Sequence, residues 1–163
     1  MKRRTTPIPA LAGCLLAALF LAGTPPSAAA QARMTVPELD RLLGDLAAGL
    51  KGDNGRWEFR FTGVPMIALA DERADRMRVV SFIEEGAGLD RQRLLVILRA
   101  NFDRTLDTRY ALSRGFLASI FLHPLSALTG PELESGLKQV SNLVRNYGGT
   151  YSSGGVRFGL ERR

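Results

Sequence analysis

The residues that could carry chemistry in this sequence are few and widely spaced. His123 is the only histidine, and it stands directly before Pro124. A histidine acts as a general base when a nucleophile lies within hydrogen-bond reach, but a lone one beside proline at a strand end is more typical of a cap or a loop. With a single histidine and a single cysteine in the chain, no set of metal ligands can be completed around it. The sequence therefore predicts no catalytic residue and no metal site.

The acidic residues also lack the arrangement that acid–base catalysis requires. Glu84 and Glu85 are adjacent, so their side chains diverge if a strand continues through them, and Asp103 and Asp107 flank a predicted turn. Paired catalytic carboxylates need surroundings that separate their pKa values, and nothing nearby indicates such a pocket. The serines have no Gly-x-Ser-x-Gly context. We therefore expect no enzyme activity and no cofactor, and keep a small exported enzyme as the alternative.

The N-terminus has the order of a secretory signal peptide. Lys2, Arg3 and Arg4 precede an apolar run over residues 10–22, and small residues follow at 28–32. The run is shorter than the roughly 20 apolar residues that a membrane-spanning helix needs. Residues 1–32 therefore predict a signal peptide that is cleaved near Ala30 or Ala32. The mature protein is expected to be periplasmic or secreted, with no integral membrane span.

Cys14 offers an alternative, because Leu11–Cys14 also resembles a lipoprotein cleavage site. Cleavage before Cys14 would leave the apolar stretch Leu15–Phe20 at the start of the mature chain. Lipoproteins have the opposite order, in which the apolar segment comes before the cysteine and a polar tether follows it. We therefore favour a plain cleaved signal and keep a lipid-anchored envelope component as the alternative.

The charge of the mature chain argues against nucleic acid as a partner. The signal contains three basic residues and no acid, so its removal lowers the net charge from +6 to +3. A charge of this size is typical of an ordinary solvated surface and does not indicate a nucleic-acid footprint. A chain of roughly 130 residues can bury one core without disulfides. We therefore predict a single domain over residues 33–163.

Apolar periodicity and capping residues predict the elements of this domain. Leucines at helical spacing, opened by Thr35 and continuing to Leu50, predict a first helix that ends at Lys51–Gly55. Alternation and short turns then predict an antiparallel meander, with strands over residues 57–61, 64–70 and 77–83.

The second half of the domain is predicted to contain a helix, a β-hairpin and a final helix. Asp90 is expected to cap a helix to about Asp103, with its arginines outward and its apolar residues toward the core (Leu94, Leu95, Ile97, Leu98 and Phe102). Strands are expected over 109–112 and 116–122, the second central and covered on both faces, followed by a helix from Thr129 to Gly148-Gly149. Residues 148–163 are predicted to be a flexible tail with an edge strand at 156–158. The order α-β-β-β-α-β-β-α favours the α+β class: an antiparallel sheet with helices packed on it.

Three features qualify as candidate binding residues. Trp57, Phe59 and Phe61 line one face of a strand, where core packing is the preferred interpretation and a groove for a peptide or a second subunit is the alternative. Asn101 falls beside the apolar face of its helix, so it must be hydrogen-bonded if buried. We expect it to tie the helix end to the following loop, with ligand binding as the alternative. The outward arginines of this helix are expected to be solvated, with an anionic lipid or polymer as the other option.

The stretch from Leu94 to Tyr147 resembles a known fold group. The features that carry the resemblance are Leu94-Leu95 with Asn101-Phe102, the strand pair through Gly115, His123-Pro124-Leu125, and the final helix with Leu133, Leu137 and Val140. Together they are similar to the type III secretion chaperone-like (CesT-like) fold, and in particular to its YbjN-like members. The resemblance implies a binding module, often a homodimer, that acts through protein–protein contact and holds an extended segment of a client. Those chaperones are cytoplasmic and commonly acidic, whereas this chain has an export signal and a mildly basic mature part. An exported YbjN-like protein is therefore the favoured interpretation.

Overall fold

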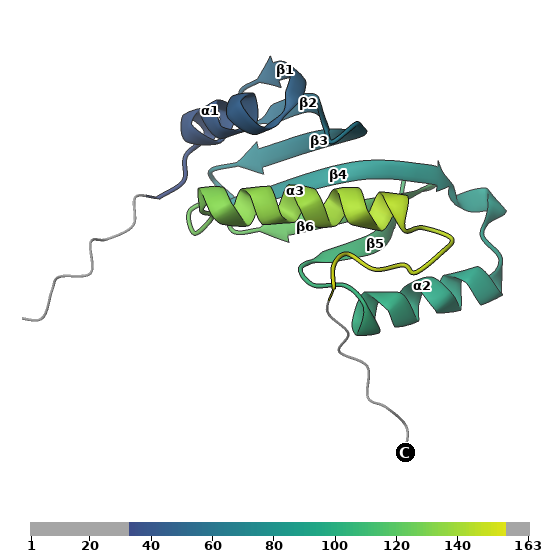
Figure 1. Ribbon diagram of the computed structural model, residues 1–163. Coiled ribbons are helices and arrows are strands. Elements are labelled where there is room, and N and C mark those ends of the chain that lie inside the picture. The colour runs from purple at the N-terminus through teal and green to yellow at the C-terminus, as the bar shows by residue number, and fades with distance from the viewer. Residues whose placement is uncertain (1–32, 156–163) are drawn as a thin grey trace, which may run out of the picture. The chain divides into compact units, whose positions relative to one another are not determined.

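The structure is a computed structural model that describes residues 33–155 (Figure 1). The predicted signal peptide over residues 1–32, Cys14 and the predicted edge strand at 156–158 lie outside the described residues. The described chain contains one six-stranded antiparallel sheet in the order β1-β2-β3-β4-β6-β5. The strands are β1 (Ala48–Asp53), β2 (Arg56–Phe61), β3 (Val64–Asp71), β4 (Arg76–Glu85), β5 (Thr108–Ser113) and β6 (Phe116–His123).

The helices begin where capping residues place them. They are α1 (Val36–Leu46), α2 (Arg91–Asp103) and α3 (Gly130–Arg145), with a short 3₁₀ turn η1 (Gly86–Gly88) before α2. Asp90 caps α2 by accepting from the Arg93 amide, and Thr129 and Glu132 form a reciprocal capping box on α3. The predicted α+β class and the antiparallel sheet are confirmed. The observed order contains one strand more than the predicted order.

The additional strand, β1, arises because the first helix is shorter than predicted. Helix α1 ends at Leu46, and Leu50, which continues the leucine spacing, lies in β1. Gly49 adopts φ +66°, a left-handed conformation that breaks a helix. The Asn54-Gly55 pair then forms a two-residue hairpin turn with both residues at positive φ, which is the strongest local hairpin signal in a sequence. The segment that was expected to stop a helix therefore pairs with β2.

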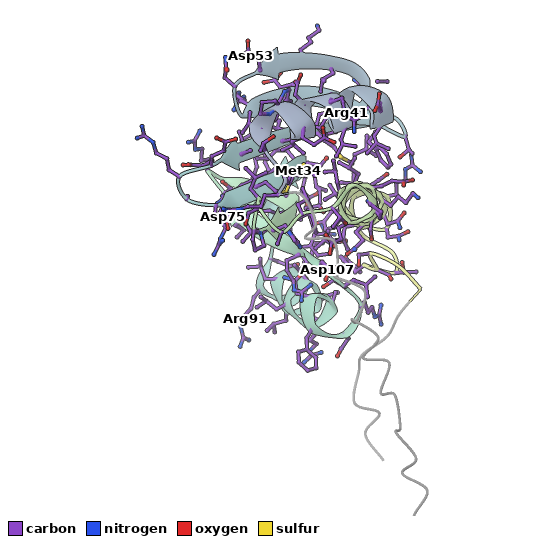
Figure 2. All side chains as sticks on the ribbon, turned by 90° about the vertical axis from the view of Figure 1, so that its left-hand side faces the viewer. Met34, Arg41, Asp53, Asp75, Arg91 and Asp107 are labelled. Atoms are coloured by element: carbon purple, nitrogen blue, oxygen red, sulfur yellow. The ribbon has the colours of Figure 1, made fainter. Side chains whose placement is uncertain are left out.

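The main core lies between one face of the sheet, called here the inner face, and helices α1 and α3 (Figure 1). Leu39 and Leu43 of α1 and Leu137 and Val140 of α3 are completely buried against inner-face residues such as Trp57. A smaller cluster lies between α2, the end of α3 and the β5–β6 end of the sheet. In Figure 2, which looks along α3, Asp53 of the β1–β2 hairpin and Arg91 of α2 mark opposite ends of the sheet.

Residues 148–155, the described part of the predicted flexible tail, are joined by hydrogen bonds to α3 and to the loop before β5. Asn142 and Asn146 of α3 donate side-chain hydrogen bonds to the carbonyls of Ser153 and Ser152, over 3.0 and 2.8 Å. The Ser153 hydroxyl in turn accepts from the Leu106 amide, and Ser153 is buried. This part of the tail therefore returns to the domain, because α3 presents amide side chains to its backbone. Serine and glycine content alone could not reveal these partners.

Candidate functional site

Helix α2 carries an apolar stripe that the described residues leave uncovered. Leu98 and Phe102 expose 62% and 68% of their surface, and Leu95 exposes 41%. They follow one another at helical spacing, with Arg91 one turn before Leu95. The prediction that Leu95, Leu98 and Phe102 face the core is therefore wrong.

The physical reason is that α2 lies beside the sheet and not over it. Only Ile97 and Ala100 are buried, and they pack with Tyr110 of β5 and Leu117 of β6. An amphipathic pattern identifies the apolar side of a helix but not which part of that side the rest of the chain will cover. The uncovered part of α2 is a candidate contact surface, which we call the α2 stripe (Leu95, Leu98 and Phe102).

Asn101 attaches α2 to the edge of the sheet. Its side-chain amide donates to the Tyr110 carbonyl over 3.0 Å and accepts from the Tyr110 amide over 2.8 Å. Strand β5 is an edge strand, so the backbone of Tyr110 would otherwise lack a neighbour on that side. Asn101 therefore occupies the place of a neighbouring strand at this residue. Its partner is strand backbone and not the loop that the sequence analysis named.

The three aromatic residues proposed as candidate partner-binding residues are placed in the core. Trp57, Phe59 and Phe61 expose 0%, 5% and 7% of their surface and belong to the main core cluster. Helices α1 and α3 cover the strand face on which they lie. They are therefore not available as a groove in this structure, and the interpretation that the sequence analysis preferred, core packing, describes their position.

A second uncovered apolar surface lies on the opposite face of the sheet, called here the outer face. On β2 this face is charged, as expected for a solvated antiparallel sheet. On β3, β4 and β6 it is mainly apolar, with Arg78 as a charged exception: Ile67 pairs with Val80, which pairs with Ile120, and Phe82 packs edge-on against Phe116. Strand β6 is thus apolar on both faces, as predicted, but no described helix covers its outer side.

His123 and the carboxylates near it are engaged in local structure. The His123 ring stacks on Phe121 and its Nδ1 lies 2.8 Å from the Pro124 carbonyl oxygen. Nearby, Glu132 accepts from the Thr129 amide in the capping box. Hydrogen bonding with the Thr129 side chain first, and with its backbone amide second, holds the pKa of the Glu132 carboxyl below the ordinary value. Within residues 33–155 no side-chain hydrogen bond joins His123 to a serine, and no three metal-ligating side chains gather.

Gln139 is a structural residue that the sequence analysis missed. It is buried on α3, accepts from the Asp107 amide and donates to the Asp107 carboxylate, both over 2.9 Å. This contact holds the loop before β5 against α3, as Asn101 holds β5 against α2. A glutamine on the apolar side of a helix is the available signal, because a buried amide needs partners.

The three tyrosines of the chain gather where α2, α3 and the C-terminal loop meet. Tyr110, Tyr147 and Tyr151 lie with ring centroids 5.6–6.1 Å apart. Burial raises the pKa of Tyr110 well above its ordinary value. Burial first, and then the hydrogen bond that its hydroxyl donates to Glu84, raise the pKa of Tyr147 to about 12.

This shift predicts a loss of stability in alkali. The Tyr147 phenol holds its proton more tightly in the folded protein than in the unfolded one. Its contribution to the free energy of unfolding is therefore fully present below pH 10.0 and is lost as the pH rises toward about 12. An alkaline titration followed by phenolate absorbance should show delayed tyrosine ionisation in the folded protein and ordinary ionisation in denaturant. Tyr147→Phe should remove one of the delayed groups. Ionisation of all three tyrosines near pH 10 in the folded protein would contradict this assignment.

Comparison with known proteins finds structures with a similar fold but no curated protein with a similar sequence. No family model and no curated protein matches the chain. Among solved structures, a chain of the HopA1–SchA chaperone–effector complex matches with a TM-score of 0.53 and 17% identity, over 67% of this chain and 88% of that one. A chain of the ExsC–ExsE complex matches with a TM-score of 0.52 and 14% identity, over 69% and 95%.

These matches cover most of both neighbouring chains, so the likeness concerns the whole architecture. Within residues 33–155, no helix is long and apolar enough to cross a membrane. The antiparallel sheet, the helices on its inner face and the flanking α2 together bear out the resemblance read from the sequence: this chain has the fold of the type III secretion chaperone-like, or CesT-like, group.

Proposed function

We propose that this protein is a non-catalytic binding module that acts through protein–protein contact and works as a homodimer. The observation that carries the proposal is the α2 stripe, where Leu98 and Phe102 each expose more than half of their surface. One solved complex that contains a chain with this fold, HopA1–SchA, is a chaperone–effector complex, which supports a protein partner for this chain too.

The ends of α2 favour a second copy as the occupant of the stripe. Arg91 is the first residue of α2 and Asp103 is the last. Two copies related by a two-fold axis would place their α2 helices antiparallel, so that the stripes cover one another. Arg91 of each copy would then approach Asp103 of the other, and opposite charges at both ends would fix the register.

The oligomeric state of the mature domain tests this part of the proposal. We expect wild-type protein to sediment as a dimer at micromolar concentration, and Leu98→Glu with Phe102→Glu to sediment as a monomer. Buried apolar anchors typically contribute about 1–4 kcal/mol each, so the dissociation constant should rise at least a hundredfold. Leu122→Glu, which changes an apolar residue of the outer face that is 51% exposed, should remain dimeric.

A charge swap separates this arrangement from general hydrophobic association. Arg91→Asp alone should weaken the dimer, and Arg91→Asp combined with Asp103→Arg should restore it, because the exchanged pair keeps opposite charges in contact. A monomeric wild type, or a dimer that Leu98→Glu with Phe102→Glu leaves intact, would refute the proposed homodimer.

We further propose that the module works outside the cytoplasm, after removal of the signal peptide. The support is the order of charged, apolar and small residues over positions 1–32. Intact mass of the protein recovered from the envelope and periplasm should give Gln31 or Arg33 as the first residue. A lipid-modified chain beginning at Cys14 would instead show an anchored envelope component.

A further inference from the structure

We propose that the outer face of the sheet binds an acidic amphipathic helix of a partner protein. The inference rests on the proposed protein-binding function and adds the surface and the chemistry of the segment that it takes. It concerns the face opposite α1 and α3, which is separate from the α2 stripe.

Two shallow grooves that adjoin one another run across the outer face from one edge of the sheet, at β1, to the other edge, at β5. One, of about 470 Å³, runs from β2 to β5, and the other, of about 460 Å³, runs from β1 to β4. They share Ile67, Val80 and Phe82 as a common apolar floor. Six strands spaced about 4.8 Å apart span about 24 Å, which matches a helix of about 16 residues. The surface therefore has the length and the apolar character to seat one helix.

The charge around this floor selects an acidic occupant. Arg56, Arg78 and Arg114 line the larger groove, and its lining contains no acidic residue. The other groove adds Lys51, Arg60 and one acid, Glu58, which is paired with Arg56, so the surroundings of the floor remain basic. Arg78 lies on β4 between Leu69 and Leu122, so its side chain starts within the apolar area and lines the groove. Within the described part of the chain, neither Arg78 nor Arg114 has an ion-pair partner. Carboxylates beside an apolar stripe would neutralise these guanidinium groups.

The occupant is a helix because the face of a sheet offers no backbone hydrogen bonds. The amides and carbonyls of β3, β4 and β6 are used in pairing within the sheet. An extended segment on this apolar floor would bury its own amides and carbonyls without partners. A helix satisfies its backbone internally and can present an apolar stripe, as α1 and α3 do on the inner face.

The charges also argue against this chain as its own occupant. The segments outside the described residues are basic, with Lys2, Arg3 and Arg4 at one end and Arg157, Arg162 and Arg163 at the other. A second copy docked face to face would bring Arg78 and Arg114 of both copies together. Like charges oppose both arrangements, which leaves a partner of opposite charge.

Two synthetic helical peptides test the proposal with the mature protein. Both have 18 residues, a leucine stripe and a fluorescent label, and they differ only in glutamate or lysine beside the stripe. By fluorescence anisotropy, we expect the acidic peptide to bind wild type at least tenfold more tightly than the basic one. Arg78→Glu should weaken the acidic peptide at least tenfold. Lys138→Glu, a charge reversal on α3 at the other side of the sheet, should change its affinity less than twofold.

Further measurements distinguish the peptide site on the outer face from the proposed homodimer contact. Leu98→Glu with Phe102→Glu should still bind the acidic peptide, so that loss of the dimer and loss of the peptide site are distinct results. Equal affinity for the two peptides, or an unchanged affinity in a folded Arg78→Glu protein, would overturn the inference. Binding to phosphatidylglycerol vesicles that depends on Arg78, without selective peptide binding, would also overturn it and assign the face to a membrane.

Discussion

Gly136→Ala should destabilise the domain, whereas the same substitution at Gly44 should stabilise it. Both glycines lie inside helices, where alanine is intrinsically better by up to about 1 kcal/mol. At Gly44 of α1 nothing lies within 4 Å of an added Cβ, so the helix gains that preference. At Gly136 of α3 the added Cβ would lie 2.7 Å from two ring atoms of Phe121, closer than real contacts allow.

The ring of Phe121 cannot move aside cheaply. It is 2% exposed, belongs to the main core and stacks on His123. Overpacking of a dense core costs about 1–3 kcal/mol, which exceeds the helical preference. Gly136→Ala should therefore lower the free energy of unfolding in urea by about 1–2 kcal/mol, and Gly44→Ala should raise it by about 0.5–1 kcal/mol.

A second substitution checks that the cause is the ring. In Phe121→Leu the added Cβ has more room, so Gly136→Ala should cost less in that background, with a coupling of about 1 kcal/mol. An equal cost in both backgrounds would place the strain elsewhere. If Gly136→Ala were as stabilising as Gly44→Ala, the close approach of α3 to β6 would be refuted.

The sequence determines most of the local structure because its signals are local. Thr129 with Glu132 makes a capping box on α3, and Asp90 caps α2. Hairpin turns fall at pairs in which a glycine follows a residue at positive φ, at Asn54-Gly55, Thr62-Gly63 and Arg114-Gly115. At the first of these pairs the sequence predicts only the end of a helix, because Leu50 extends the leucine spacing of α1 by coincidence.

Coverage of a surface was beyond sequence analysis because it depends on contacts between distant segments. The apolar side of α2 was identified correctly, but its burial requires a neighbour over it, and the described chain provides one only at Ile97 and Ala100. The sequence likewise predicts that the apolar outer side of β6 is covered, whereas no described helix covers it. In each case the pattern shows that a residue favours burial, but it cannot show whether this chain supplies the residues that cover it. At the two proposed binding surfaces, the described chain does not supply such residues.

Asn101 is a polar residue that itself covers a surface, because its side chain caps the backbone of Tyr110 at the edge of the sheet. Replacing it with leucine should lower the free energy of unfolding by about 2–4 kcal/mol, because the amide and carbonyl of Tyr110 would each lose a partner beside a buried side chain. Urea unfolding of Asn101→Leu measures this loss.

Asn101→Asp provides the matched control, since it keeps the shape and the acceptor but removes the donor. The Tyr110 amide would keep its hydrogen bond, and the Tyr110 carbonyl would face a carboxylate oxygen in place of an N–H group. We expect this variant to be less stable than wild type at neutral pH and to recover as the carboxyl is protonated, because a protonated carboxyl can donate. Asn101→Leu should show no such recovery.

Loss of this contact should also change how the protein behaves in solution. Without the Asn101 amide, the outer edge of β5 presents unpaired backbone to other chains, and uncovered strand edges promote association. Asn101→Leu should therefore form larger aggregates by light scattering under conditions where Leu122→Glu does not. If Asn101→Leu retained wild-type stability and solubility, the side-chain amide would not be what closes this edge, and the position of α2 beside β5 would have to rest on Ile97 and Ala100 alone.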